Sequence, residues 1–134
     1  MKRISPYIGF DGKTREAIEF YKGIFGGDAT YMKWSDTPVP CETGKEDWIM
    51  HAQLEFDGFA VMGTDMSGPE GRKVGNNMSI SIECSSEEEI NRLFAGLSEG
   101  GNVFCPVGPA FWGGTFGMTF DKYGVPWVFT HSEG

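Results

Sequence analysis

The residues best suited to chemistry stand in the short stretch "HAQLEF", where His51, Gln53 and Glu55 alternate with apolar residues. Side chains two residues apart in a β-strand point to the same face, so this spacing predicts a polar row on one strand face. His51 is the strongest candidate for a general acid or base because imidazole changes charge near neutral pH. Gln53 and Glu55 would orient a polar ligand. A hydrated sheet face with a structural histidine explains the same pattern without chemistry.

The first of two hairpins with similar patterns spans residues 51–65 and contains this row. The second hairpin spans residues 115–131. Asp57-Gly58 is a strong signal for a two-residue turn, and residues 121–124 form the second turn. Asp57 and Asp121 are expected to bond local backbone there. We align Phe56 with Phe120 and Gly58 with Gly124, which makes the second turn two residues longer. This alignment predicts that four side chains of the second hairpin face the core: Phe116, Met118, Phe120 and Trp127.

An amphipathic helix precedes each hairpin, with apolar residues at helical spacing. The apolar positions are Ala17, Phe20, Tyr21, Ile24 and Phe25 in the first helix and Ile90, Leu93, Phe94 and Leu97 in the second. Glycine pairs at 26–27 and 100–101 end the helices, and Ser86 with Glu89 predicts a capping box. Strands are expected at 6–10, 29–34, 78–84 and 102–107. The chain therefore reads as β-α-β-β-β twice, about 1–66 and 76–134, joined by a Gly-rich linker of about 67–75.

Composition sets further bounds on the protein. The chain has 134 residues, enough for one domain, and a net charge of −8, which argues against a nucleic-acid partner. It contains no apolar run long enough to span a membrane and no signal-peptide pattern, so a cytoplasmic location is expected. Three cysteines without a CxxC pair indicate a reducing compartment. Cys84 is expected to be a core residue, and Cys41 is the more exposed thiol.

The duplicated pattern resembles the vicinal oxygen chelate superfamily of glyoxalases, dioxygenases and bleomycin-resistance proteins, and within it the PhnB-like branch. The matching segments are "ISPYIGFDGKTREAIEFYKGIFGG", "IMHAQLEFDGFAVMGTD", "SISIECSSEEEINRLFAGLSEGG" and "FWGGTFGMTFDKYGVPWVFTH". The resemblance implies an α+β fold in which two βαβββ units form curved mixed sheets around a cleft, with the helices outside. It also implies a small-molecule ligand and a homodimer. His51 resembles the histidine of the branch's "MHA" motif.

Metal enzymes of this superfamily place ligands on the first and last strands of each unit. Strand alternation directs Met78, Ile80 and Ile82 toward the helix and leaves Glu83 facing the cleft. The positions that resemble the ligand sites are Tyr7, Met62, Ser79 and Val128. None of these is a good ligand for a divalent ion, so we expect no metal and no other cofactor.

We therefore expect a metal-free small-molecule-binding protein of the PhnB-like branch, with His51 carrying any catalysis. The predicted ligand contacts are Tyr7, Gln53, Glu55, Met62, Ser79, Glu83 and Trp112. His131 is expected to be structural or to lie at a dimer contact. The sequence leaves open whether the protein turns over a substrate.

Two alternatives belong to different functional classes. One is a metal-dependent enzyme of the glyoxalase, dioxygenase or thiol-transferase type. The other is a drug-sequestering resistance protein, for which the acidic charge and the tryptophans in or beside loops (Trp34, Trp48 and Trp112) would suit a cationic aromatic drug. Related sequences are sometimes labelled ubiquinone-pathway methyltransferases, but this chain has no glycine-rich nucleotide loop to support that label.

Overall fold

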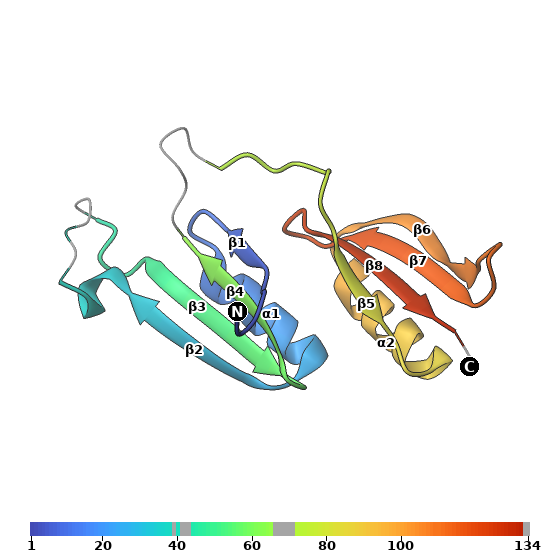
Figure 1. The fold of residues 1–134 in the computed structure, drawn as a ribbon. Helices are drawn as coiled ribbons and strands as arrows, with labels where there is room; N and C mark the ends of the chain where they lie inside the picture. The colour runs from blue at the N-terminus through green and yellow to red at the C-terminus, as the bar shows by residue number, and fades with distance from the viewer. Residues whose placement is uncertain (39, 41–43, 66–71, 133–134) are drawn as a thin grey trace. The chain divides into compact units, whose positions relative to one another are not determined.

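The structure, a computed structural model, describes residues 1–38, 40, 44–65 and 72–132. The chain divides into two compact units, Met1–Lys73 and Val74–Gly134. In the residues that the structure describes, each unit contains one α-helix and a four-stranded sheet (Figure 1). This arrangement confirms the α+β class and the two βαβββ units expected from the sequence. Among the described residues, no helix is long and apolar enough to cross a membrane.

The first unit runs β1 (Tyr7–Gly9), α1 (Thr14–Phe25), β2 (Asp28–Lys33), a 3-10 turn at Trp34–Asp36, β3 (Ile49–Phe56) and β4 (Phe59–Thr64). Its sheet has the strand order β1-β4-β3-β2. β1 is parallel to β4, and the other neighbours are antiparallel. Gly26, at a φ of 77°, ends α1 as predicted, and its N–H donates to the carbonyl of Lys22 at 2.8 Å.

The second unit repeats this plan with β5 (Ile80–Glu83), α2 (Glu87–Ser98), β6 (Asn102–Pro109), β7 (Thr115–Phe120) and β8 (Pro126–His131). The strand order is β5-β8-β7-β6, with β5 parallel to β8. The predicted capping residues begin α2: the N–H of Glu89 donates to Ser86 Oγ at 3.1 Å. The Glu89 carboxylate in turn accepts from the N–H of Ser85 at 2.9 Å.

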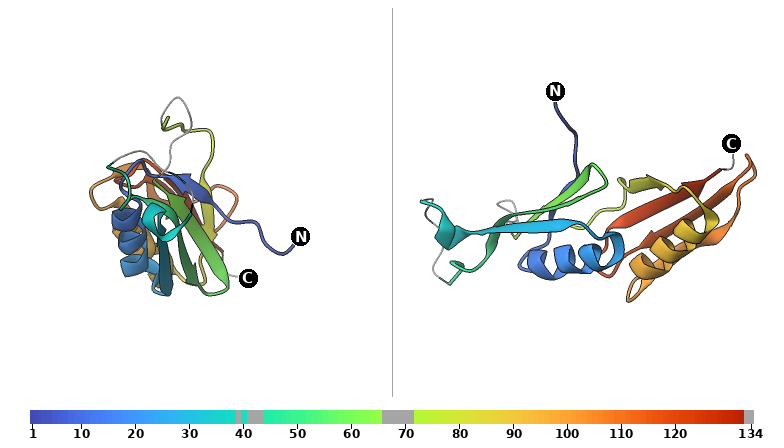
Figure 2. Two further views of the ribbon diagram at one scale, coloured as in Figure 1. Left: turned by 90° about the vertical axis from the view of Figure 1, so that its left-hand side faces the viewer. Right: turned by 90° about the horizontal axis from the view of Figure 1, so that it is seen from below.

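In each unit the helix covers one face of its sheet, and the described residues place no helix on the other face (Figure 2). We call that other face the open face. In the first unit Ile18 and Tyr21 of α1 are fully buried together with Leu54 of β3. In the second unit Ile90 and Leu97 are fully buried, as are two aromatic residues of β8, Trp127 and Phe129. Burying each such side chain stabilises the fold by about 1.5–3 kcal/mol.

Buried polar groups fix the ends of the elements. The Asp65 carboxylate accepts the N–H of Thr14 at 2.9 Å and that of Ile49 at 2.7 Å, so it joins the start of α1 to the start of β3. In the second unit the buried His131 ring contacts the carbonyl of Cys84 through Nδ1 at 3.0 Å. His131 is thus buried in its own unit, in agreement with a structural role.

The structure confirms that Asp121 bonds local backbone in the second turn, as expected. Its Oδ1 accepts from the N–H groups of Tyr123 at 2.8 Å and Val125 at 3.0 Å. Its Oδ2 accepts from the indole N–H of Trp127 at 2.9 Å. The carboxylate therefore holds both the second turn and a core tryptophan.

The predicted facing of the second hairpin is wrong for three of its four residues. A Cβ added at Gly117 would lie 3.1 Å from the Phe94 ring of α2, and the Thr119 hydroxyl accepts from Ser98 of α2 at 2.8 Å. Gly117 and Thr119 therefore face the helix. Because side chains alternate, Phe116, Met118 and Phe120 lie on the open face. Trp127 faces the core as predicted.

The physical reason is the length of the second turn. Phe56 pairs with Phe59 across a two-residue turn, whereas the N–H of Asp121 donates to the carbonyl of Val125 at 2.9 Å. Asp121, not Phe120, therefore takes the place of Phe56, and the turn is one residue longer rather than two. A shift of one residue moves every side chain of a strand to the other face. Accordingly Phe56 stacks on Phe25 of α1, whereas Phe120 contacts Phe104 of β6.

The expectation that Met78 faces the helix is also wrong. β5 begins at Ile80, so Met78 lies before the strand, and 80% of its surface is exposed. The alternation that holds within a strand does not extend to a residue that is not paired in the sheet.

Candidate functional site

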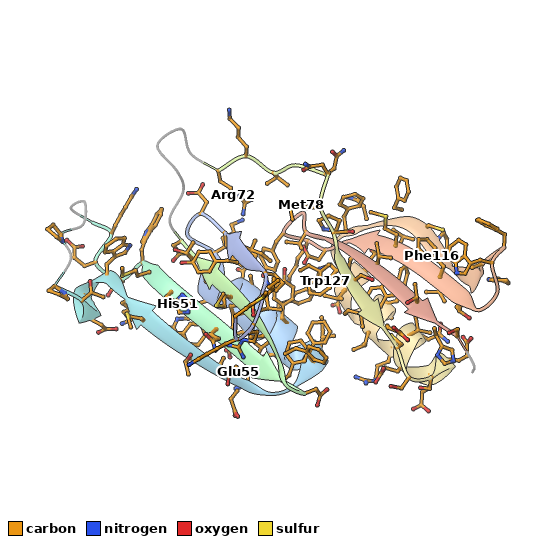
Figure 3. All side chains as sticks on the ribbon, viewed as in Figure 1. His51, Glu55, Arg72, Met78, Phe116 and Trp127 are labelled. Atoms are coloured by element: carbon orange, nitrogen blue, oxygen red, sulfur yellow. The ribbon has the colours of Figure 1, made fainter. Side chains whose placement is uncertain are left out.

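Three side chains of β3, His51, Gln53 and Glu55, form a row on the open face of the first sheet, and we call them the polar row. Ala52 and Leu54 between them are fully buried, which confirms the alternation predicted for this strand. His51 and Gln53 are half-buried and Glu55 is exposed. Figure 3 shows His51 and Glu55 at separate places along the strand. Four residues of strand extend about 13 Å, so one small group cannot contact both.

Tyr7 flanks one end of the polar row. Its ring stacks on the imidazole of His51, with ring centroids 5.7 Å apart and an angle of 28° between the planes. Tyr7 is paired with Met62 in the parallel β1–β4 ladder, and Met62 is paired with Gln53 in the next ladder. Tyr7, Met62 and the polar row therefore share the open face. The structure thus brings together five of the predicted site residues.

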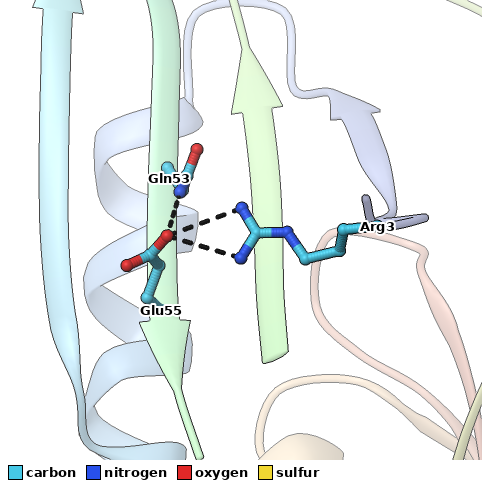
Figure 4. Close-up of polar contacts among 3 residues, drawn as sticks. All are labelled: Arg3, Gln53 and Glu55. Atoms are coloured by element: carbon cyan, nitrogen blue, oxygen red, sulfur yellow. Dashed lines mark hydrogen bonds and ion pairs between the residues drawn. The ribbon is translucent and has the colours of Figure 1, made fainter. Parts of the chain in front are cut away.

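Arg3 lies at the other end of the row (Figure 4). Both terminal nitrogens of its guanidinium lie 3.5 Å from Oε1 of Glu55. The Gln53 amide donates to the same oxygen. The side chains of Arg3 and Glu55 are 43% and 55% exposed, so the ion pair stands in water. Sequence reasoning missed Arg3 because no pattern in the N-terminal segment indicates contact with a strand fifty residues further on.

The predicted residues of the second unit occupy a different setting. Ser79 lies before β5 and is exposed. The register pairs Ser81 with Val128, as Tyr7 is paired with Met62, so Ser81 occupies the position that corresponds to Tyr7. Glu83 is exposed and pairs with Thr130. Trp112 precedes β7 and contacts the rings of Phe111 and Phe116, at 4.8 and 5.6 Å.

The central strand of the second sheet carries an apolar row in place of the polar one. Met118 pairs with Val128 as Gln53 pairs with Met62, so Phe116, Met118 and Phe120 stand where the first sheet has His51, Gln53 and Glu55. Phe104, which is 71% exposed, extends this row through its contact with Phe120. The alternation in "TFGMTF" predicts a row of apolar side chains on one face of the strand. The alignment of the turns assigned this row to the helix-covered face, whereas it lies on the open face.

Trp34, Trp48 and Cys84 contribute to the local structure. The N–H of Trp34 donates to the carbonyl of Trp48 at 3.0 Å, which closes the segment between β2 and β3. Cys84 is buried as predicted, and burial, with a smaller contribution from the Glu89 charge, raises the pKa of its thiol to about 11. Cys41 lies outside the described residues.

The positions that resemble the superfamily's metal ligands do not fit a divalent ion. They hold the phenol of Tyr7, the thioether of Met62 and the aliphatic side chain of Val128; the fourth position was predicted to be Ser79, but the register assigns it to Ser81, also a serine hydroxyl. None offers the imidazole or carboxylate donors that such ions take. In the part of the chain that the structure describes, no three His, Cys, Asp or Glu side chains gather in a group able to hold a metal.

Two βαβββ units with one helix-covered and one open face define the glyoxalase/bleomycin-resistance/dioxygenase type of fold. The chain is similar in fold to a glyoxalase-related enzyme from Fulvimarina pelagi, at 18% identity over 98% of this chain and 89% of that one, with a TM-score of 0.59. Within this class, the chain belongs to the PhnB-like family described as 3-demethylubiquinone-9 3-methyltransferase, which matches residues 2–130.

Relatives within the family cover nearly the whole chain. The structure of protein PA1353 from Pseudomonas aeruginosa is 37% identical, covers 98% of both chains and has a TM-score of 0.88. A PhnB protein from Bacillus cereus is 30% identical over 97% of this chain and 99% of that one, with a TM-score of 0.76. Protein YjdN from Escherichia coli K12 is 26% identical over 93% of this chain and 92% of its own length.

Proposed function

We propose that this protein binds a small polar molecule on the open face of its first sheet, with the polar row and Tyr7 as the binding residues. The observation that carries the proposal is the stacked Tyr7–His51 pair beside Gln53. An imidazole held against an aromatic ring loses freedom before a ligand arrives, and such preorganisation lowers the cost of binding. The neighbouring amide offers both a donor and an acceptor.

His51 is the residue to which we assign any proton transfer on this face. It is half-buried on the open face, whereas the only other histidine, His131, is buried against the Cys84 carbonyl. Among protein side chains, imidazole is the one most often used as a general acid or base. We include no metal ion in this proposal, because among the described residues no three His, Cys, Asp or Glu side chains gather in a group able to hold one.

The two histidines make a direct test by NMR. A library of small polar compounds would be screened against the protein with selectively labelled histidine rings. We expect a binding compound to shift the His51 ring signals and to leave those of His131 in place, and His51→Gln to weaken the binding. A compound that binds without moving the His51 signals, and equally well to the variant, would refute the proposal.

A second candidate function rests on the apolar row of the second sheet. Exposed aromatic surface of this kind is uncommon on soluble domains unless it binds something. Phe104 and Phe120, whose rings contact each other, would stack against a flat aromatic ligand, and the chain's charge of −8 would attract a cationic one. This matches a sequestering protein, which needs no catalytic group.

Quenching of tryptophan fluorescence by proflavine, a planar aromatic cation, tests this candidate. We expect Phe104→Leu to weaken the quenching and Phe59→Leu to leave it unchanged, since Phe59 is a comparably exposed ring in the first unit. Equal quenching in all three proteins would exclude the candidate. The homodimer and the cytoplasmic location remain predictions; sedimentation at several protein concentrations measures the first.

A further inference from the structure

The N-terminal segment places a guanidinium on the proposed binding face. The segment lies on the side of the first sheet away from α1 (Figure 2), and the N–H of Met62 donates to the carbonyl of Pro6 at 2.9 Å. From this anchor the Arg3 side chain crosses β4 to reach Glu55 on β3 (Figure 4). Arg3 therefore occupies part of the face on which the proposed function depends.

The contact between Arg3 and Glu55 is long and exposed to solvent, so it is a weak structural link. Two terminal nitrogens share one carboxylate oxygen at 3.5 Å, longer than a strong charge-assisted hydrogen bond, and both partners are about half exposed. Exposed ion pairs of this kind contribute little to stability, so a competing cation can displace the guanidinium.

The surroundings of the Glu55 carboxylate also favour the binding of a guanidinium group. The Gln53 amide donates to Oε1 and thereby orients the carboxylate. Asp28 is paired with Glu55 across β2 and β3, which adds a second negative charge beside the site. The local charge therefore favours a cation, as the charge of the whole chain does.

From these contacts we propose that Glu55 receives a guanidinium group of the ligand, and that Arg3 is a tethered competitor for the same carboxylate. This inference rests on the proposed function and specifies its ligand as an organic cation. A tethered group acts at an effective concentration in the millimolar range, so it excludes weak cations and yields to those that make further contacts along the row.

Benzylguanidinium and its neutral isostere benzylurea are the probes, with binding measured by calorimetry and by the NMR signals of the Gln53 amide. We expect Arg3→Gln to raise the affinity for benzylguanidinium about threefold to fivefold, which corresponds to about 0.7–1 kcal/mol. Lys2→Gln removes the same charge from the neighbouring exposed residue and should leave the affinity unchanged. Glu55→Gln should abolish the binding, and benzylurea should not respond to the Arg3 variant.

Equal affinity of the Arg3 and Lys2 variants, undiminished binding to the Glu55 variant, or no binding of benzylguanidinium to any variant would overturn the inference. Each of these results is separable from failure of the proposed function. A neutral compound that shifts the His51 signals would keep the polar row as a binding site while removing Glu55 as its cation acceptor.

Discussion

The ring of Tyr7 lies on the imidazole of His51, although the two residues belong to strands that are separated by β4. The pair can form because β1 runs parallel to β4 in a register that sets Tyr7 opposite Met62, on the same open face as the polar row. An aromatic ring from one strand thus defines the surroundings of the only half-buried histidine.

Replacing Tyr7 by leucine is expected to shift the His51 ring signals in NMR spectra, because the stacked ring is lost, and to leave those of His131 unchanged. Tyr7→Phe keeps the ring and should keep the His51 signals close to their original positions. If the leucine variant left His51 unaffected, the stacking would not persist in solution.

Removing the Asp65 carboxylate with Asp65→Ala is expected to lower the free energy of unfolding by about 3 kcal/mol, because two buried N–H groups, of Thr14 and Ile49, lose their acceptor. Urea denaturation measures this change. Asp57→Asn is the matched control, since Asp57 is exposed in a turn at a φ of 50° that asparagine also tolerates. The control should change stability by less than about 0.5 kcal/mol; equal effects would contradict the anchoring role of Asp65.

Two glycine-to-alanine changes should alter the stability of the fold in opposite directions. A Cβ at Gly117 would lie 2.8 Å from Val107 and 3.1 Å from Phe94, so Gly117→Ala overpacks the core and should cost about 1–3 kcal/mol. Gly23 is exposed within α1 and has open space around it, so Gly23→Ala should stabilise the fold by up to about 1 kcal/mol. Thermal unfolding of both variants checks the pair, and a tolerated Gly117→Ala would show that β7 does not face α2 as described.

Because of the buried Cys84 thiol, we expect the free energy of unfolding to fall in alkali. Its thiol has a pKa raised to about 11 in the fold from 9.0 outside it, mainly by burial. The unfolded chain therefore loses this proton first as pH rises, and the contribution of the neutral thiol, complete below pH 9, disappears between about 9 and 11.

Cys84→Ala isolates this effect, because the other groups that titrate in alkali, Tyr31 among them, are common to both proteins. Denaturation at a series of pH values should show a smaller decline above pH 9 in the variant than in the parent. Identical pH dependence would mean that Cys84 does not stay buried as a neutral thiol.

The duplicated architecture could be predicted because it depends on local sequence patterns. Helical spacing, glycine stops and the Ser86 cap each specify local structure, and all three appear in the fold as expected. The alternation of "HAQLEF" likewise gave the correct faces, since buried Ala52 and Leu54 leave only one assignment.

The second hairpin was less predictable because the residues that most resemble a core lie on its open face. Phe116 and Phe120 on the open face are more apolar than Gly117 and Thr119, which face the helix. Hydrophobicity alone therefore selects the wrong side. The length of the turn decides the register, and that length depends on how Asp121 bonds Tyr123 and Val125.

The replacement of the polar row by an apolar one at matching strand positions also bears on stoichiometry. Two repeats of one architecture would ordinarily offer two equivalent sites per chain. Here the side chains at those positions share no chemistry, so a compound recognised by His51 and Gln53 finds no equivalent partners at Phe116 and Met118. Titration should therefore saturate at one equivalent of such a compound per chain, despite the internal repeat.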